Sequence, residues 1–135
     1  MRILIDTNVF VSAVLNPRGM VAKALSTAVE GDDDVVVCDY SFAELHDVFV
    51  RKFPDRIGKL PQFMAYVTQG VTIVAAPLAK TPSELVLRDP DDQPILTAAI
   101  VTEVDAIMTG DKDLLDAGLT RPKAISPGEY LNSKL

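Results

Sequence analysis

Short runs of apolar residues alternate along the chain with longer segments in which apolar residues recur every three to four positions. The short runs predict buried strands, and the longer segments predict helices. The expected strands are residues 3–5, 35–38, 71–75, 106–109 and 124–125. The expected helices are residues 7–15, 20–30, 41–53, 60–68, 94–101, 112–117 and a last helix that opens at Ser126. Alternation of strands and helices is typical of an α/β fold with a mainly parallel sheet.

Local signals mark where several of these helices begin and end. Pro54 ends the helix over residues 41–53, because proline lacks the amide hydrogen that a continuing helix needs. Ser126, followed by proline and by Glu129, forms a capping box that opens the last helix. Residues 81–87 match neither the strand pattern nor the helix pattern.

Four acidic residues fall at comparable places in this pattern. Asp6 directly follows the first strand, and Asp111 lies just beyond the fourth. Glu44 lies in the first turns of the helix after the second strand, and Asp92 at the entry of the helix over residues 94–101. Strand carboxyl ends and the helix starts that follow them share one edge of a parallel sheet, where ligands bind. The four acids are therefore expected to converge there.

Convergent carboxylates repel one another, and without a counter-charge some of them must take up protons. A hard divalent cation removes this conflict, and sites built from oxygen ligands alone suit Mg²⁺ or Mn²⁺. Such a site activates water and stabilises charge on a phosphoryl group during its transfer. The pattern therefore favours phosphodiesterase-like or phosphatase-like chemistry.

Each acid also has a purely structural interpretation. Asp6 is suited to cap the helix that begins at Thr7. Glu44 fits a capping box with Ser41, which would fold it back on its own helix end. Asp92 is suited to be a plain N-cap, and Asp111 to lie in a solvated turn. These interpretations do not explain why all four acids fall at one predicted edge.

Composition limits the class of protein. The chain has 135 residues, of which 48% are hydrophobic, which predicts a single folded domain over residues 1–135. Thirteen basic and 19 acidic residues give a formal charge of −6, which argues against a broadly basic nucleic-acid-coating protein. The single cysteine, Cys38, and the single histidine, His46, exclude a disulfide and a multi-histidine or cysteine zinc site. No stretch predicts a secretory signal or a membrane span, so a cytoplasmic location is expected.

Charged residues cluster in two further places. One place holds four basic residues within nine positions, which form either the solvated end of a helix or a patch for a negatively charged partner such as RNA: Arg51, Lys52, Arg56 and Lys59. The acidic run over residues 32–34 predicts a solvated loop rather than a second metal site.

Four motifs together resemble the PIN-domain nuclease family. The opening Ile-Leu-Ile-Asp-Thr-Asn over residues 3–8 is similar to the start of that family, and Ser-Phe-Ala-Glu-Leu over residues 41–45 to its second motif. Residues 88–99, which contain Asp-Pro-Asp-Asp, resemble the third acidic motif, and Thr-Gly-Asp-Lys-Asp over residues 109–113 resembles the fourth. The last two are similar to a subgroup related to VapC, the toxins of toxin–antitoxin systems. The resemblance covers nearly the whole chain, in order.

The resemblance implies a three-layer α/β/α sandwich with a short central parallel sheet. It also implies Mg²⁺- or Mn²⁺-dependent endoribonuclease activity, an antitoxin protein as partner, and a homodimer. Asp6, Glu44, Asp92 and Asp111 match the metal-binding acids of the family, and Asn8 and Thr109 fall where polar residues support that cluster. Two prolines bracket Asp92 and leave Asp91 as the alternative ligand; the following Ile-Leu-x-Ala-Ala run favours Asp92.

The sequence also bears on two other functional classes. A PIN-like module without turnover would still bind RNA or an antitoxin, although acids at all four positions argue for an active enzyme. A phosphotransfer receiver requires paired acids before the first-strand aspartate, and residues 1–5 contain none. A phosphatase with an Asp-x-Asp-x-Thr motif is also disfavoured, because residue 8 is Asn8.

Overall fold

The computed structural model describes residues 1–77 and 86–135, and places helices and strands close to where the sequence predicts them. The strands are β1 (Arg2–Ile5), β2 (Asp34–Cys38), β3 (Thr72–Val74), β4 (Ala106–Met108) and β5 (Lys123–Ile125). The α-helices are α1 (Thr7–Leu15), α2 (Met20–Glu30), α3 (Asp39–Lys52), α4 (Leu60–Val67), α5 (Gln93–Val101), α6 (Lys112–Leu115) and α7 (Pro127–Ser133), with 3-10 helices η1 (Pro54–Lys59) and η2 (Pro90–Asp92). Of the segment 81–87, residues 81–85 lie outside the described residues.

The strands of the described residues form one parallel sheet in the order β3-β2-β1-β4-β5. The chain therefore builds outward from β1 to β2 and β3, and then crosses back to add β4 and β5 on the other side of β1. The crevice outside the carboxyl ends of two strands at such a reversal is where open α/β sheets bind ligands. Here that point lies between β1 and β4.

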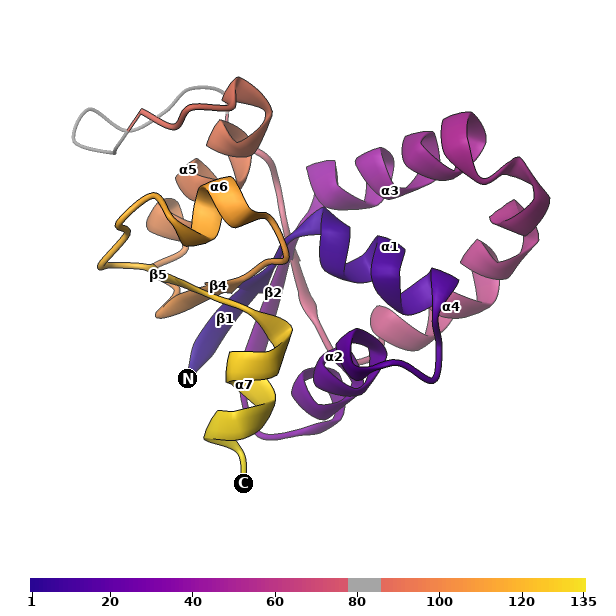
Figure 1. Cartoon of the computed structure of the whole chain (residues 1–135), viewed down its shortest axis with the longest axis horizontal. Helices are drawn as coiled ribbons and strands as arrows, with labels where there is room; N and C mark the ends of the chain where they lie inside the picture. The colour runs from indigo at the N-terminus through magenta and orange to yellow at the C-terminus, as the bar shows by residue number, and fades with distance from the viewer. Residues whose placement is uncertain (78–85) are drawn as a thin grey trace.

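Alternating side chains of the central strands face opposite layers of helices. Ile3 and Ile5 of β1 belong to the core beneath α1, α2, α3, α4 and α7, whereas Leu4 belongs to the core beneath α5 and α6. The period of two follows from the pleat of a strand. Because both faces are covered, the central strands β1, β2 and β4 are apolar apart from the first residues of β1 and β2, as is typical of parallel sheets. Figure 1 shows the result, a three-layer α/β/α sandwich with a short central sheet.

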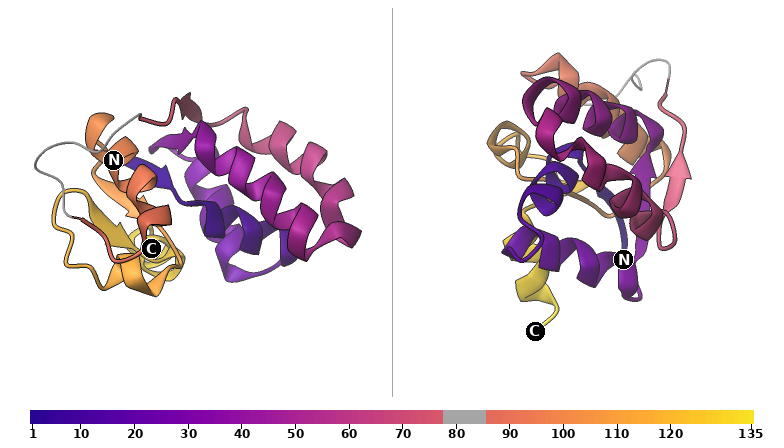
Figure 2. Two further views of the ribbon diagram at one scale, coloured as in Figure 1. Left: turned by 90° about the horizontal axis from the view of Figure 1, so that it is seen from above. Right: turned by 90° about the vertical axis from the view of Figure 1, so that its right-hand side faces the viewer.

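The strand order also divides the molecule into two sides. In Figures 1 and 2 the earlier part of the chain, coloured indigo to pink, gathers on one side of β1, and the orange to yellow part on the other. Residues at the carboxyl end of β1 lie at the junction of the two sides. Segments about a hundred residues apart in sequence meet there, as the hydrogen bond from the Asp6 amide to the Met108 carbonyl shows (2.9 Å).

The acidic run over residues 32–34 is only in part the solvated loop that the sequence predicts, because Asp32 and Asp34 are exposed but Asp33 is not. The Asp33 carboxylate is 7% exposed and accepts hydrogen bonds from the N-terminal ammonium (2.9 Å), the Tyr130 hydroxyl (2.7 Å) and the Lys134 ammonium (2.6 Å). The donors hold the pKa of Asp33 well below its usual range, despite the opposing effect of burial. Asp33 therefore ties the start of the chain to its last helix, by contacts nearly a hundred residues apart.

Candidate active site

Asp6 is a buried carboxylate at the carboxyl end of β1, with 4% of its surface exposed. It caps α1 by accepting a hydrogen bond from the Thr7 amide (2.8 Å), as its structural interpretation predicts. Its other oxygen accepts from the Thr109 hydroxyl (2.8 Å) and from Nδ2 of Asn8 (3.1 Å). The donors on this carboxylate are all neutral, so none of them compensates its charge.

The pKa of Asp6 is raised from 3.8 to about 6. Burial is the main cause, and the hydrogen bonds from Thr109 and Thr7 oppose it. The negative charges of Glu44 and Asp111 raise the pKa further. Three of the four predicted acids therefore interact electrostatically at one place, and the fold holds their charges together at a free-energy cost.

Asn8 and Thr109 link the two strands that flank this place. Asn8 Nδ2 donates to the Thr109 hydroxyl oxygen (3.2 Å), and Asn8 Oδ1 accepts from the Gly110 amide (2.8 Å). The Thr109 hydroxyl also accepts from the Asp111 amide (3.0 Å). The two side chains therefore fix the backbone after β4 relative to the start of α1, and both contact Asp6 directly.

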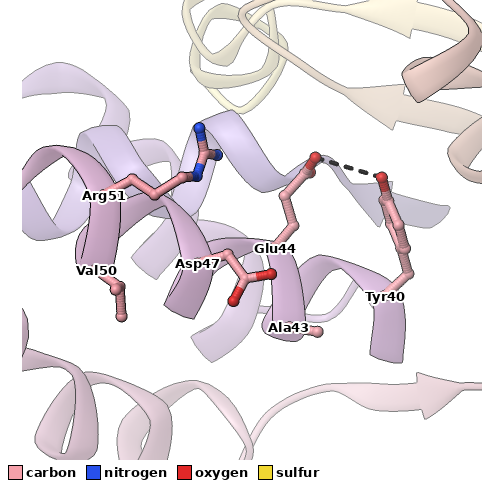
Figure 3. Close-up of a pocket in the computed structure, with 6 residues that line it drawn as sticks. All are labelled: Tyr40, Ala43, Glu44, Asp47, Val50 and Arg51. Carbon is pink, nitrogen blue, oxygen red and sulfur yellow. Dashed lines mark hydrogen bonds between the residues drawn. The ribbon is translucent and has the colours of Figure 1, made fainter.

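Glu44 lies two residues further into its helix than the sequence predicts. Helix α3 begins at Asp39, directly after β2, so Ser41 is inside the helix and cannot cap it. The buried Ser41 hydroxyl has no hydrogen-bond partner in the described part of the chain, and the predicted capping box with Glu44 does not form. The structural interpretation of Glu44 is therefore wrong. Instead, the Tyr40 hydroxyl donates to Glu44 Oε2 over 3.4 Å, as Figure 3 shows.

Asp92 faces the same acids from the start of α5. It occupies the N-cap position of α5, as its structural interpretation predicts, but its side chain makes no capping hydrogen bond. Its pKa is raised from 3.8 to about 7, first by burial and then by a hydrogen bond shared with Asp111 and by the charges of Asp111, Asp6 and Asp89. A proton shared between two carboxyls is the expected response of like charges brought together. Asp91, the alternative ligand, is exposed.

Asp111 is the acid for which the structural and functional interpretations coincide. Its carboxylate caps α6 by accepting from the Asp113 amide (2.9 Å), as Asp6 caps α1. The same carboxyl is close enough to share a hydrogen bond with Asp92. The cap therefore fixes the position of Asp111 without removing it from the acidic cluster.

A groove of about 350 Å³ runs past these acids. Its walls come from α1, α3 and the η2 turn, which the fold brings together from distant parts of the sequence. The acids on its walls are Asp6, Glu44, Asp89, Asp91 and Asp92, joined by the polar residues Thr7, Asn8 and Ser12 and by Lys52. A groove lined by so many oxygens, with one cation, suits a ligand that brings its own positive charge or arrives with a metal ion.

Sequence reasoning missed two contributors to this site. Tyr40 precedes Glu44 by four residues, the spacing that places side chains together on a helix, but the helix was expected to begin after Tyr40. Asp89 accepts a hydrogen bond from the Asp91 amide (2.9 Å) and so shapes the turn that presents Asp92. The sequence signal for such a turn is an aspartate followed by proline, because its side chain can accept a hydrogen bond from the amide two residues further on.

Comparison with known proteins identifies the family. Residues 2–113 match the PIN domain, so the chain belongs to the PIN domain family, whose members are generally nucleases. The uncharacterized protein MJ1680 of Methanocaldococcus jannaschii is 29% identical over 120 residues, which cover 84% of this chain and 73% of that protein.

A solved structure has the same fold. It is the crystal structure of VapBC2 from Rickettsia felis bound to a DNA fragment from their promoter. The match has a TM-score of 0.67 and 14% sequence identity, and it covers 93% of this chain and 98% of the other. At this identity the likeness shows the fold, and it agrees with the three-layer α/β/α sandwich predicted from the sequence.

Proposed function

We propose that this chain is a Mg²⁺- or Mn²⁺-dependent endoribonuclease, with residues 1–135 acting as one nuclease domain. The observation that carries the proposal is the buried Asp6 carboxylate, whose pKa is raised to about 6 where the charges of Glu44 and Asp111 also act. Groups with such perturbed pKa values cluster at functional sites, because a buried charge lowers the stability of the fold and is retained for function. Membership of the PIN domain family supports the same conclusion.

Asp6, Glu44, Asp92 and Asp111 would hold the metal, with Asn8 and Thr109 fixing the Asp6 carboxylate. The donor set fits, since all six residues offer oxygen and Mg²⁺ and Mn²⁺ favour oxygen ligands. Within residues 1–77 and 86–135, no three His, Cys, Asp or Glu side chains are already arranged as a metal site. Ion binding would therefore include movement of the half-buried Asp92 and Asp111 side chains. When bound, the ion would activate water and stabilise charge on a phosphoryl group.

The remaining side chains support this chemistry by neutral hydrogen bonding. Thr109 and Asn8 donate to one oxygen of Asp6 and leave its charge intact. Tyr40 donates to Glu44 and orients that carboxylate beside the groove. His46 is exposed, with 64% of its side chain accessible, and lies outside the groove. Proton transfer in the reaction would therefore involve carboxylates and water rather than this histidine.

A role as the toxin of a toxin–antitoxin pair follows from the family resemblance. The structural neighbour from Rickettsia felis is a VapBC2 assembly, so a small antitoxin protein is the partner we expect here, and a homodimer the expected assembly. No helix among the described residues is long and apolar enough to cross a membrane. We place the protein in the cytoplasm, where its RNA substrate is found.

The decisive experiment is cleavage of single-stranded RNA with Mg²⁺ or Mn²⁺, with EDTA, and with the variant Asp6→Asn. Asp116→Asn, which changes an exposed acid that does not line the groove, is the matched control. Cleavage that requires metal, is lost in Asp6→Asn and is retained in Asp116→Asn is the expected result. Cleavage that survives EDTA would refute the metal-dependent mechanism. Metal binding with no cleavage of varied RNAs would instead indicate a silent module that binds RNA or an antitoxin.

A further inference from the structure

Of the basic residues that follow Glu44, one lines the acidic groove and one lines a cavity beside it. Lys52 lines that groove together with Glu44. Arg51 lines a second cavity of about 340 Å³, of which Glu44 is also a wall. Arg56 and Lys59 lie in η1 and contribute to neither wall. Glu44 is therefore the point at which two adjoining cavities meet, with one basic residue in each.

Helix geometry explains why these two residues lie near Glu44. Arg51 is seven residues beyond Glu44, so it returns to within about 20° of the same face of α3. Lys52 lies about 80° round from Glu44, on the side of Val48, which also lines the acidic groove. Figure 3 shows the Arg51 and Glu44 side chains extending to the same side of α3, with Ala43 and Val50 turned away from it. Along the helix axis the two basic residues lie about 11–12 Å beyond Glu44.

Both cations are available to a ligand. Arg51 and Lys52 are exposed. In the described residues the ion pairs join other groups: Met1 and Lys134 with Asp33, Arg2 with Asp34, His46 with Asp47, and Arg88 with Asp113. Arg51 and Lys52 take part in none of them, although acids lie close by along the same helix. Unpaired cations beside an acidic groove attract an anion that extends past the acids.

The proposed function supplies that anion, and the inference rests on it. A polynucleotide carries a phosphate at every unit, so a phosphodiester positioned at the acids has neighbouring phosphates a short distance along the strand. We propose that Arg51 and Lys52 bind phosphates on one side of the scissile one, so that single-stranded RNA lies along α3. Such contacts supply affinity and position the strand without selecting its sequence.

The test is equilibrium binding of a fluorescein-labelled single-stranded RNA, in EDTA so that metal-dependent cleavage does not consume it. Arg51→Gln and Lys52→Gln are compared with Arg56→Gln and Lys59→Gln, which remove the same charge from exposed residues outside the groove. Each of the first two should weaken binding about 3- to 10-fold at low salt. Each should also reduce the steepness with which log K for binding falls against log salt by about 0.7, the value for one phosphate contact on a single strand.

A second substrate separates positioning from catalysis. Bis(4-nitrophenyl) phosphate has no further phosphates, so Arg51→Gln and Lys52→Gln should impair its metal-dependent hydrolysis less than they impair RNA cleavage, and the control variants Arg56→Gln and Lys59→Gln should match wild type. For RNA, Arg51→Gln and Lys52→Gln should raise KM and leave kcat nearly unchanged, because the lost contacts lie outside the reacting phosphate. A DNA strand of the same sequence should show the same losses, since phosphate contacts do not depend on the sugar.

Unchanged RNA affinity and salt slope in Arg51→Gln and Lys52→Gln would overturn the inference, as would equal losses in the two control variants. These results are distinguishable from a failure of the proposed function. If wild type cleaves no RNA with any divalent metal but binds it through these two residues, the binding surface stands and the nuclease proposal fails. If both variants cleave RNA with unchanged KM, the nuclease stands and the binding surface fails.

Discussion

Replacing Asp6 by asparagine should stabilise the metal-free protein at alkaline pH. In wild type the pKa of Asp6 rises from 3.8 in the unfolded chain to about 6 in the folded protein, chiefly through burial. The folded carboxylate is therefore destabilising once it is charged. At about 1.36 kcal/mol per pH unit, this rise amounts to about 3 kcal/mol.

The pH dependence follows from linkage. Below pH 3.8 the group is protonated in both states and contributes nothing, and above about pH 6 it is charged in both and the full penalty applies. Asn lacks the charge but also presents an amide where Thr109 and Asn8 now donate, which costs about 1 kcal/mol. The net gain in the free energy of unfolding should be about 1–2 kcal/mol at pH 8. It should disappear or reverse near pH 4.

Urea unfolding in EDTA at several pH values between 4 and 8 measures this difference directly. Asp116→Asn, which alters an exposed acid, is the control and should follow wild type throughout. An Asp6→Asn protein that is less stable than wild type at pH 8 would refute the reasoning. So would a difference between the two proteins that does not vary with pH.

Three further outcomes are expected. Affinity for Mg²⁺ or Mn²⁺, measured by calorimetry, should rise from pH 5.5 to pH 8, because the metal must displace protons from Asp6 and Asp92. The pKa values of these two residues are raised to about 6 and about 7. An affinity that does not change with pH would contradict this. Thr109→Val should preserve the buried volume but raise the pKa of Asp6 and weaken metal binding about 10-fold. Lower stability with unchanged metal affinity would assign Thr109 a structural role only. Asp33→Asn should lower the free energy of unfolding, measured by chemical denaturation, by about 1–3 kcal/mol at pH 7. This loss should shrink below pH 4, because the pKa of Asp33 is depressed in the folded protein. Equal stability of the variant and wild type would contradict the prediction.

Most helices and strands could be predicted because their signals are local. Strands β1 and β2 are apolar runs after their first residue, and the capping box at Ser126 forms as predicted. The start of α3 could not be found in this way. Ser41 and Glu44 have the spacing of a capping box, but the helix continues directly from β2 at Asp39 and buries Ser41. Burial against the rest of the molecule prevails over the local capping preference.

The acids of the site could be predicted from the sequence, but their raised pKa values could not. The order of strands and helices places Asp6 and Asp111 at one edge of the sheet, and the structure brings Glu44 and Asp92 to the same place. The raised pKa values depend on burial, which no spacing in the sequence measures. The role of Asp33 was missed for a related reason: its partners Tyr130 and Lys134 are about a hundred residues away.

The central claim is that the acids at the carboxyl ends of β1 and β4 form a single divalent metal site. The most direct measurement is the anomalous scattering of Mn²⁺ in crystals of the protein grown with that ion. We predict a peak bonded to a carboxylate oxygen of Asp6 and shared with at least one of Glu44, Asp92 and Asp111, directly or through water. Saturating Mn²⁺ with no peak at Asp6, or with a peak only at other surface acids, would contradict the account.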